Sequence, residues 1–111
     1  MSSPSRENIS LWYAIQTHAK QEARAESNLL SWNVETFAPR YLSRRRRDFK
    51  REPTYTAKPL FPGYIFARFD AEAMSHKIRY TRGVRGIVSV GHRPVPVEDA
   101  VISMIMSRYG E

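Results

Sequence analysis

Residues 58–70, which contain four aromatic residues, two prolines and one glycine, constrain the fold of this chain more than any other segment. Pro59 and Pro62 each fix φ and lack a backbone donor, and Gly63 lets the chain bend, so an extended turn is expected here. The branched and aromatic residues that follow predict a strand over residues 64–69. Its two faces would carry Tyr64, Phe66 and Arg68 on one side and Ile65, Ala67 and Phe69 on the other. Since both faces are largely apolar, either the protein covers both of them or one face binds a partner.

Hydrophobic periodicity predicts further strands and helices along the rest of the chain. Strands are expected over residues 11–17, 34–42, 55–57 and 86–90, and helices over residues 18–32, 71–79 and 98–109. Thr17 would cap the start of the first helix and Asn33 its end. Ala25, Leu29 and Trp32 would form the buried stripe of this helix. Because no regular β-α-β repeat is present, we expect an α+β fold, an antiparallel β-sheet flanked by helices.

Positive charge is concentrated in one part of the chain. The sequence has 18 Lys and Arg against 11 Asp and Glu, which gives a formal net charge of +7. Residues 44–51 contain six basic residues and one acidic residue, so they supply five of these seven charges. Such an excess favours a polyanionic partner.

The length of the chain predicts one domain, and the absence of Cys excludes thiol chemistry. The chain has 111 residues and no Cys. Residues 1–9 are expected to form a disordered tail and residues 10–111 a single folded domain that acts as a monomer. No apolar run approaches the ~20 residues of a membrane helix, so a cytoplasmic protein without membrane contact is expected.

The residue patterns of common catalytic sites are missing from the sequence. His18, His76 and His92 are too far apart for a helical metal pair, and no glycine-rich phosphate loop is found. Glu22 and Glu26 are interpreted as a solvated helix start rather than as an acid–base pair. We therefore expect no catalytic residues, no metal, no cofactor and no small-molecule substrate, and we predict that the protein is not an enzyme.

Four motifs in order resemble the N-terminal (NGN) domain of the NusG family of transcription elongation factors. They are the Trp12-Tyr13 pair, residues 59–66, residues 81–84 and residues 93–97. The resemblance implies an α/β sandwich over most of the chain. Residues 81–84, together with the phenylalanine before Ala67, favour the specialised RfaH-like antiterminators within the family. The C-terminal KOW domain of the family is not expected within these 111 residues.

The first candidate site is apolar and consists of Phe61, Pro62, Tyr64, Phe66, Ile102 and Ile105. Composition alone favours ordinary core positions for this set. The resemblance instead implies an exposed surface that binds the clamp helices of the largest subunit of bacterial RNA polymerase, where aromatic side chains are effective anchors. It also implies that Ser75, His76 and Lys77 contact the opposite lobe of the polymerase.

Two further candidate sites are polar. The second consists of His18, Lys20, Gln21, Arg24, Thr81 and Arg82. Taken alone, these are exposed polar residues or a nucleic-acid contact; the resemblance implies that they face the non-template DNA strand of the transcription bubble. The third candidate consists of Arg44, Arg45, Arg46 and Arg47. It is either a solvated loop or an arm that contacts duplex DNA or nascent RNA without sequence preference.

These features predict a transcription elongation or antitermination domain that binds RNA polymerase, contacts bubble DNA and suppresses pausing. Three alternatives stay open: a general NusG-type elongation factor, a basic RNA-binding module that stacks bases on sheet aromatics, and a generic interaction domain.

Overall fold

The computed structural model describes residues 9–45 and 54–110. Apart from Ile9, the expected tail lies outside this part of the chain, as do Arg46 and Arg47. The elements, in chain order, are β1 (Leu11–Thr17), α1 (Glu22–Ser31), β2 (Glu35–Phe37), β3 (Arg40–Arg45), β4 (Thr54–Pro59), β5 (Tyr64–Phe69), α2 (Ala71–Arg79), β6 (Val84–Ile87), β7 (Ser89–Val90), β8 (Arg93–Pro94), β9 (Pro96–Val97) and α3 (Asp99–Tyr109). Within the described residues, no helix has the length and apolar character needed to cross a membrane.

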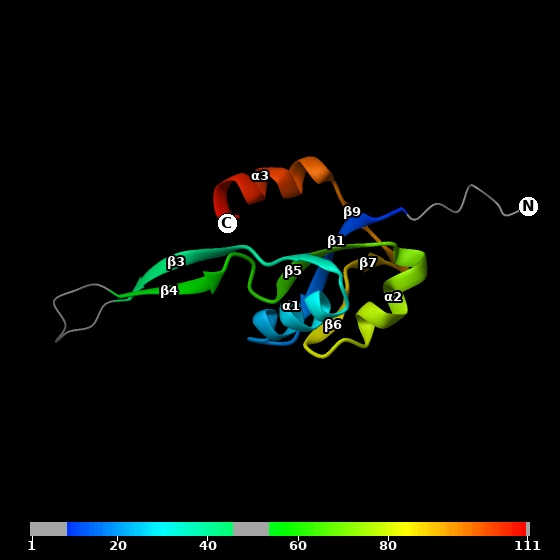
Figure 1. The fold of residues 1–111 in the computed structure, drawn as a ribbon, viewed down its shortest axis with the longest axis horizontal. Coiled ribbons are helices and arrows are strands. Elements are labelled where there is room, and N and C mark those ends of the chain that lie inside the picture. Colours follow the sequence, from blue (N-terminus) through cyan, green and yellow to red (C-terminus); the bar gives the residue numbers. More distant parts are fainter. Residues whose placement is uncertain (1–8, 46–53, 111) are drawn as a thin grey trace, which may run out of the picture.

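Five strands form the main sheet, and every pairing in it is antiparallel. The strand order is β2-β5-β1-β6, and β9 also pairs with β1. β1 and β5 are in register from Leu11 to Gln16, which makes them the centre of the sheet. β9 pairs with β1 at Trp12, and β6 pairs with β1 from Ile15 onward. This arrangement confirms the predicted α+β fold with an antiparallel sheet flanked by helices (Figure 1).

Helices cover both faces of this sheet (Figure 1). On one face, α1 and α2 bury the side chains that β5 directs toward them, which are Ile65, Ala67 and Phe69. On the other face, α3 packs over Phe66, and its own Ile102 and Ile105 become buried. The predicted alternation along β5 is therefore confirmed, and the chain itself covers both apolar faces.

The burial under α3 corrects one expectation about the apolar site. Phe66, Ile102 and Ile105 are only 8%, 2% and 8% exposed, so the expectation that they form part of an exposed surface is wrong. The physical reason is that an uncovered sheet face would leave Trp12 and Phe66 in water. The two isoleucines, three positions apart on one side of α3, remove this apolar area from solvent.

Helix α1 begins later than predicted and ends one residue earlier, at Ser31, with Trp32 rather than Asn33 as its C-cap. Residues 18–21 form a turn, in which the Gln21 N–H donates to the His18 carbonyl over 3.0 Å, so Thr17 ends β1 and does not cap the helix. At the other end, Asn33 has a φ of 63°, and its N–H donates to the Leu30 carbonyl over 2.9 Å. The next N–H donates to the carbonyl of Leu29 over 3.1 Å, which completes a Schellman motif.

Trp32 is the C-cap of α1 and not part of its buried face. Its side chain is 46% exposed, so the prediction that it lies in the core is wrong. The helix turns into the Schellman motif at this residue, and this change of direction takes the indole away from the stripe that Ala25 and Leu29 form.

The strand predicted over residues 34–42 is broken into two strands that belong to different sheets. β2 is an edge strand of the main sheet, whereas β3 pairs with β4 in a separate two-stranded hairpin that extends away from the body (Figure 1). The break falls at Pro39, which has no N–H for a ladder hydrogen bond and whose carbonyl accepts the N–H of Leu60 over 2.9 Å. The strand predicted over residues 86–90 is likewise divided, into β6 and β7.

Candidate protein and nucleic-acid interface

The loop over residues 60–64, called the aromatic loop below, is fixed by hydrogen bonds to the end of β1 and the start of α1. The Gly63 N–H donates to Oε2 of Glu22 over 2.7 Å, and the Gly63 carbonyl accepts the Thr17 N–H over 2.8 Å. Gly63 has a φ of 87°, a conformation that favours glycine. Glu22 is 9% exposed, so the interpretation of this residue as a solvated helix start is wrong: its carboxylate holds the loop in place.

The aromatic loop exposes two rings above a buried aromatic layer. The side chains of Phe61 and Tyr64 are 38% and 39% exposed, and Pro62 is exposed between them. The Phe61 ring meets the buried Phe66 ring edge to face, with 5.8 Å between their centroids. The ring of Phe66 in turn stacks on that of Phe37 at 6.2 Å. The six apolar candidates thus divide into three surface residues of the loop and three buried residues that support them.

A cavity of about 590 Å³ opens between α1, the β3–β4 hairpin and the end of α3. Its apolar lining includes Phe37, Tyr41, Leu42, Met106 and Tyr109. Through Phe37 it continues the aromatic contacts that begin at Phe61. Sequence periodicity did not reveal this cavity, because its walls come from elements that are far apart in the chain.

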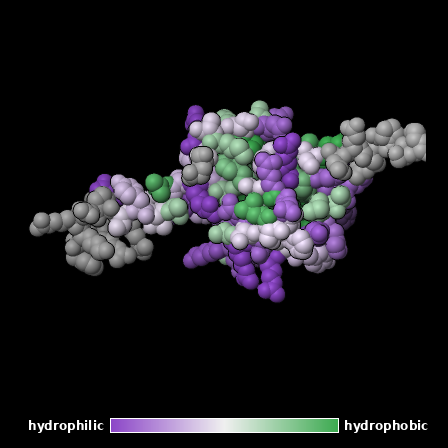
Figure 2. Space-filling view, viewed as in Figure 1, coloured by the Kyte–Doolittle hydropathy of each residue, from purple (hydrophilic) through white to green (hydrophobic). Residues whose placement is uncertain are grey.

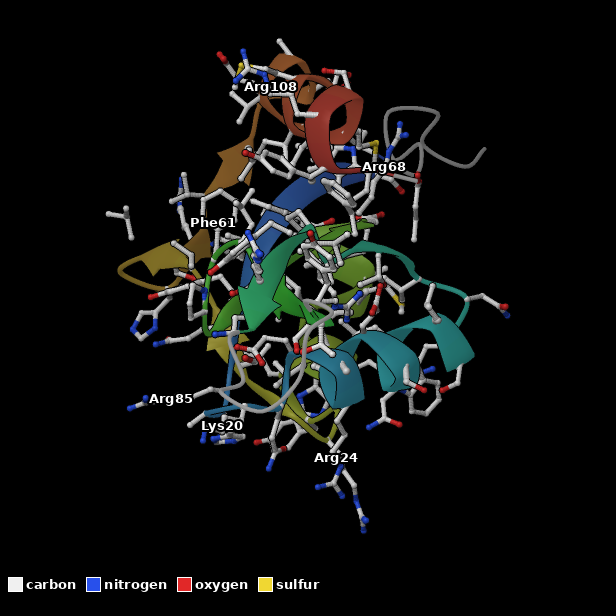
Figure 3. All side chains as sticks on the ribbon, turned by 90° about the vertical axis from the view of Figure 1, so that its left-hand side faces the viewer. Lys20, Arg24, Phe61, Arg68, Arg85 and Arg108 are labelled. Atoms are coloured by element: carbon white, nitrogen blue, oxygen red, sulfur yellow. The ribbon has the colours of Figure 1, made fainter. Side chains whose placement is uncertain are left out.

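Four basic side chains, called the cationic end below, gather on the side of the molecule opposite α3. They are Lys20, Arg24, Arg82 and Arg85, and all are exposed. Figure 3 shows Lys20, Arg24 and Arg85 pointing away from the body, far from Arg108 on α3, with Phe61 between these two ends. Hydrophilic side chains also project from this edge in Figure 2. The sequence pattern did not single out Arg85, whose place beside the other three residues depends on the pairing of β6 with β1.

The loop that carries Arg82 packs directly against α1. Nδ2 of Asn28 donates to the Arg82 carbonyl over 3.0 Å, and the His18 N–H donates to the Gly83 carbonyl over 3.0 Å. Gly83 has a φ of 94°, and a Cβ added there would lie 2.8 Å from the backbone nitrogen of Ala25. Only glycine allows this approach, which brings together two candidate segments that are about 60 residues apart in the sequence.

No acidic side chain in the described part of the chain forms an ion pair with the cationic end. Glu22 accepts from Gly63, and Glu26 forms an ion pair with Arg40 at 2.9 Å. The ion pairs among the described residues do not include any member of the cationic end. This end therefore presents four exposed positive charges that have no ion-pair partner among the described residues.

Two of the remaining polar candidates of the second site differ in exposure from the other members. Thr81 is 5% exposed, and its Oγ1 donates to the Lys77 carbonyl over 2.9 Å, so this side chain closes the end of α2 and is not available to a ligand. Gln21 is half-buried, whereas His18 is exposed.

The described residues of the third candidate site lie on the hairpin. Arg44 is exposed and lies opposite Tyr55, and Arg45 lies opposite Thr54.

The candidates Ser75, His76 and Lys77 lie in the last turns of α2. Ser75 is half-buried, and the other two residues are exposed. The imidazole of His76 contacts the ring of Tyr80 with 4.8 Å between centroids, and Nζ of Lys77 lies 4.4 Å from the centroid of the Trp32 ring. The exposed indole thus takes part in a cation–π contact that the sequence pattern did not predict.

Together, the fold and these surfaces define a small α+β domain. It has an exposed aromatic loop and a separate cationic end, and its described residues include no group of three or more His, Cys, Asp or Glu that could hold a metal ion. The sequence pattern of the NusG family, described as transcription termination factor NusG, matches residues 10–106, and the chain belongs to this family. The predicted family is confirmed.

Relatives and a solved structure agree with this assignment. Proteins named transcription termination/antitermination protein NusG are 24% identical in Deinococcus radiodurans and 28% identical in Thermus thermophilus, over 117 and 116 residues. Each match covers 89% of this chain, but the chain spans only 62% and 61% of the length of those proteins. The structure described as domain interaction in Thermotoga maritima NusG is similar with a TM-score of 0.65 and 25% identity, over 92% of this chain and 58% of that one.

Proposed function

We propose that this domain is a transcription elongation or antitermination factor that bridges RNA polymerase and the DNA of the transcription bubble. The observation that carries the proposal is the shared anchoring of the two surfaces. Thr17 and His18 donate consecutive backbone N–H groups, the first to the aromatic loop at Gly63 and the second to the loop of Arg82 at Gly83. A protein contact and a nucleic-acid contact are therefore held in one fixed relation.

The aromatic loop is the proposed contact for the clamp helices of the largest polymerase subunit. Phe61 and Tyr64 suit this role because each ring is exposed while its backbone is fixed, so little conformational entropy is lost on binding. The buried Phe66, Ile102 and Ile105 act indirectly, by supporting the loop from below. Ser75, His76 and Lys77 are proposed to contact the opposite lobe of the polymerase.

The cationic end is the proposed contact for the non-template DNA strand. Lys20, Arg24 and Arg82 would neutralise phosphates, and His18 and Gln21 would reach base edges. Arg44 to Arg47 would add a contact to duplex DNA or nascent RNA that does not depend on sequence.

Binding to the clamp helices and to the opposite lobe at the same time would stabilise one conformation of the elongating polymerase. A ligand shifts a conformational equilibrium only by its difference in affinity for the two states. Gripping two parts of the polymerase at a fixed separation would therefore disfavour an opened, paused state. This action requires no cofactor, and a single copy of the chain is sufficient for it.

Within this proposal the domain has one of two roles, that of a specialised antiterminator or that of a general elongation factor. A specialised RfaH-like antiterminator must recognise one recruitment sequence, whereas a general NusG-type factor needs only sequence-tolerant DNA contacts. Templates with randomised non-template bubble sequence separate them, because equal suppression of pausing on every template would exclude the specialised role. A basic RNA-binding module is the alternative of a different class.

The experiment that tests the proposal is capture of core RNA polymerase by the immobilised domain, with and without nuclease. We expect capture to survive nuclease treatment. In the Phe61→Ala/Tyr64→Ala variant capture should be weakened, because the binding free energy falls by more than about 1 kcal/mol. Val90→Ala, which removes a 74% exposed apolar side chain outside the proposed contacts, is the control. Capture that disappears with nuclease, or that the double variant retains, would contradict the proposal.

A further inference from the structure

Tyr80 at the end of α2 has the most exposed large apolar or aromatic side chain in the described part of the chain, at 77%. Its backbone, in contrast, is firmly held. The Tyr80 N–H donates to the His76 carbonyl over 3.2 Å, and the next residue, Thr81, is buried and bonded to the end of the helix. The ring is therefore an exposed group on a rigid base, and the imidazole of His76 supports it at a centroid distance of 4.8 Å.

The surroundings of Tyr80 are cationic. Arg79 and Arg82, on either side of it in the sequence, are both exposed. The hydrogen bond from Asn28 to the Arg82 carbonyl places this loop beside α1. Asn28 and Arg24 are four residues apart on α1 and so share one of its faces. The loop after Tyr80 thus runs along the face of α1 that carries Arg24.

Acidic groups of α2 lie away from this region. Asp70 caps the start of the helix, where its carboxylate accepts the N–H of Glu72 over 3.0 Å, and both residues are at the end of α2 opposite Tyr80. Among the described residues, the cationic end has no ion-pair partner. An exposed tyrosine alone is ordinary, but a fixed exposed ring bordered by unpaired arginines is how proteins hold single-stranded nucleic acid.

We propose that Tyr80 is a stacking platform for a base of single-stranded DNA whose phosphates lie along Arg82 and Arg24. The inference rests on the proposed contact between the cationic end and the bubble, and it adds a residue with a distinct role. Stacking uses the π-face that every base has, so Tyr80 supplies affinity without sequence preference. Arg82 and Arg24 supply the salt-dependent part of the binding.

The test compares two fluorescently labelled strands of equal length, an oligothymidine and an abasic strand that keeps the phosphates but lacks the bases. Tyr80→Ala should weaken binding of oligothymidine by about 5- to 150-fold, the range for loss of one base–aromatic stack, and should leave binding of the abasic strand unchanged. Tyr80→Phe keeps the ring and should bind both strands as the wild type does. Tyr109→Ala, on α3, is the control for loss of a tyrosine elsewhere.

The outcomes separate this inference from the proposed function. Arg24→Ser should weaken binding of both strands, and if it has no effect, or if the wild type binds neither strand, the proposed DNA contact itself is wrong. If Arg24→Ser behaves as expected but Tyr80→Ala weakens both strands equally or neither, only the stacking role is overturned. Oligouridine RNA of the same length is tested in the same assay. If Tyr80→Ala weakens binding of this RNA but not of oligothymidine, the assignment to DNA is overturned. The melting temperature of Tyr80→Ala should equal that of the wild type, because the ring is exposed.

Discussion

Replacing Glu22 by alanine tests whether the start of α1 holds the aromatic loop. The carboxylate accepts the Gly63 N–H over 2.7 Å and is nearly buried. Loss of a hydrogen bond to a charged group costs about 1.5–3 kcal/mol. For a domain of this size, about 1 kcal/mol corresponds to about 4 °C, so the melting temperature should fall by about 6–12 °C. Thermal unfolding followed by circular dichroism measures this change.

Two further variants make the Glu22 experiment specific. Glu22→Gln keeps an oxygen acceptor without the charge, so its melting temperature should lie between those of the wild type and Glu22→Ala. Glu26→Ala, one turn further along the same helix, removes a partly exposed ion pair with Arg40, which is worth about 0.2–1 kcal/mol. The explanation would be refuted if Glu26→Ala were as destabilising as Glu22→Ala, or if glutamine at position 22 gave no recovery.

Two other predictions concern the core. Ile102→Ala should lower the free energy of unfolding by about 2–5 kcal/mol, and Met104→Ala, whose side chain is 57% exposed, by no more than about 0.5 kcal/mol; similar values in urea unfolding would show that α3 does not cover the sheet. Burial, with the negative charge of Asp70 as the second cause, raises the pKa of Tyr13 above its ordinary value of 10.0. The unfolded state then loses this proton first, so stability should fall as the pH rises above about 10, and Tyr13→Phe should remove this part of the pH dependence.

Local patterns in the sequence were sufficient for the elements whose form depends on nearby residues. β1 and the helix over residues 71–79 were predicted with their observed bounds, and the last helix differs by one residue. The alternation along β5 correctly separated Ile65 from Phe66, because the two-residue period of a strand is a local property. Asn33 marked the end of α1 to within one residue, since its left-handed conformation is a local signal as well.

Predictions failed where a contact between distant segments decides the outcome. Thr17 has the chemistry of a helix cap, but pairing of β1 with β6 at Val84, together with the hydrogen bond to Gly63, extends the strand through it. The pattern of residues 34–42 fits one strand, and only the tertiary fold assigns its two halves to different sheets. Glu22 has the pattern of a solvated residue, and its burial depends on Gly63, 41 residues away in the sequence.

The candidate sites show the same division. The sequence by itself determined which residue types are available: an aromatic segment at residues 61–66, a basic run at residues 44–51, and the motifs of the NusG family. The tertiary structure decided which of these side chains reach solvent. It placed α3 over Phe66, buried Thr81 and exposed Tyr80, and it joined Arg85 to the cationic end. Exposure depends on what packs against a residue from elsewhere in the chain, and no local pattern records that contact.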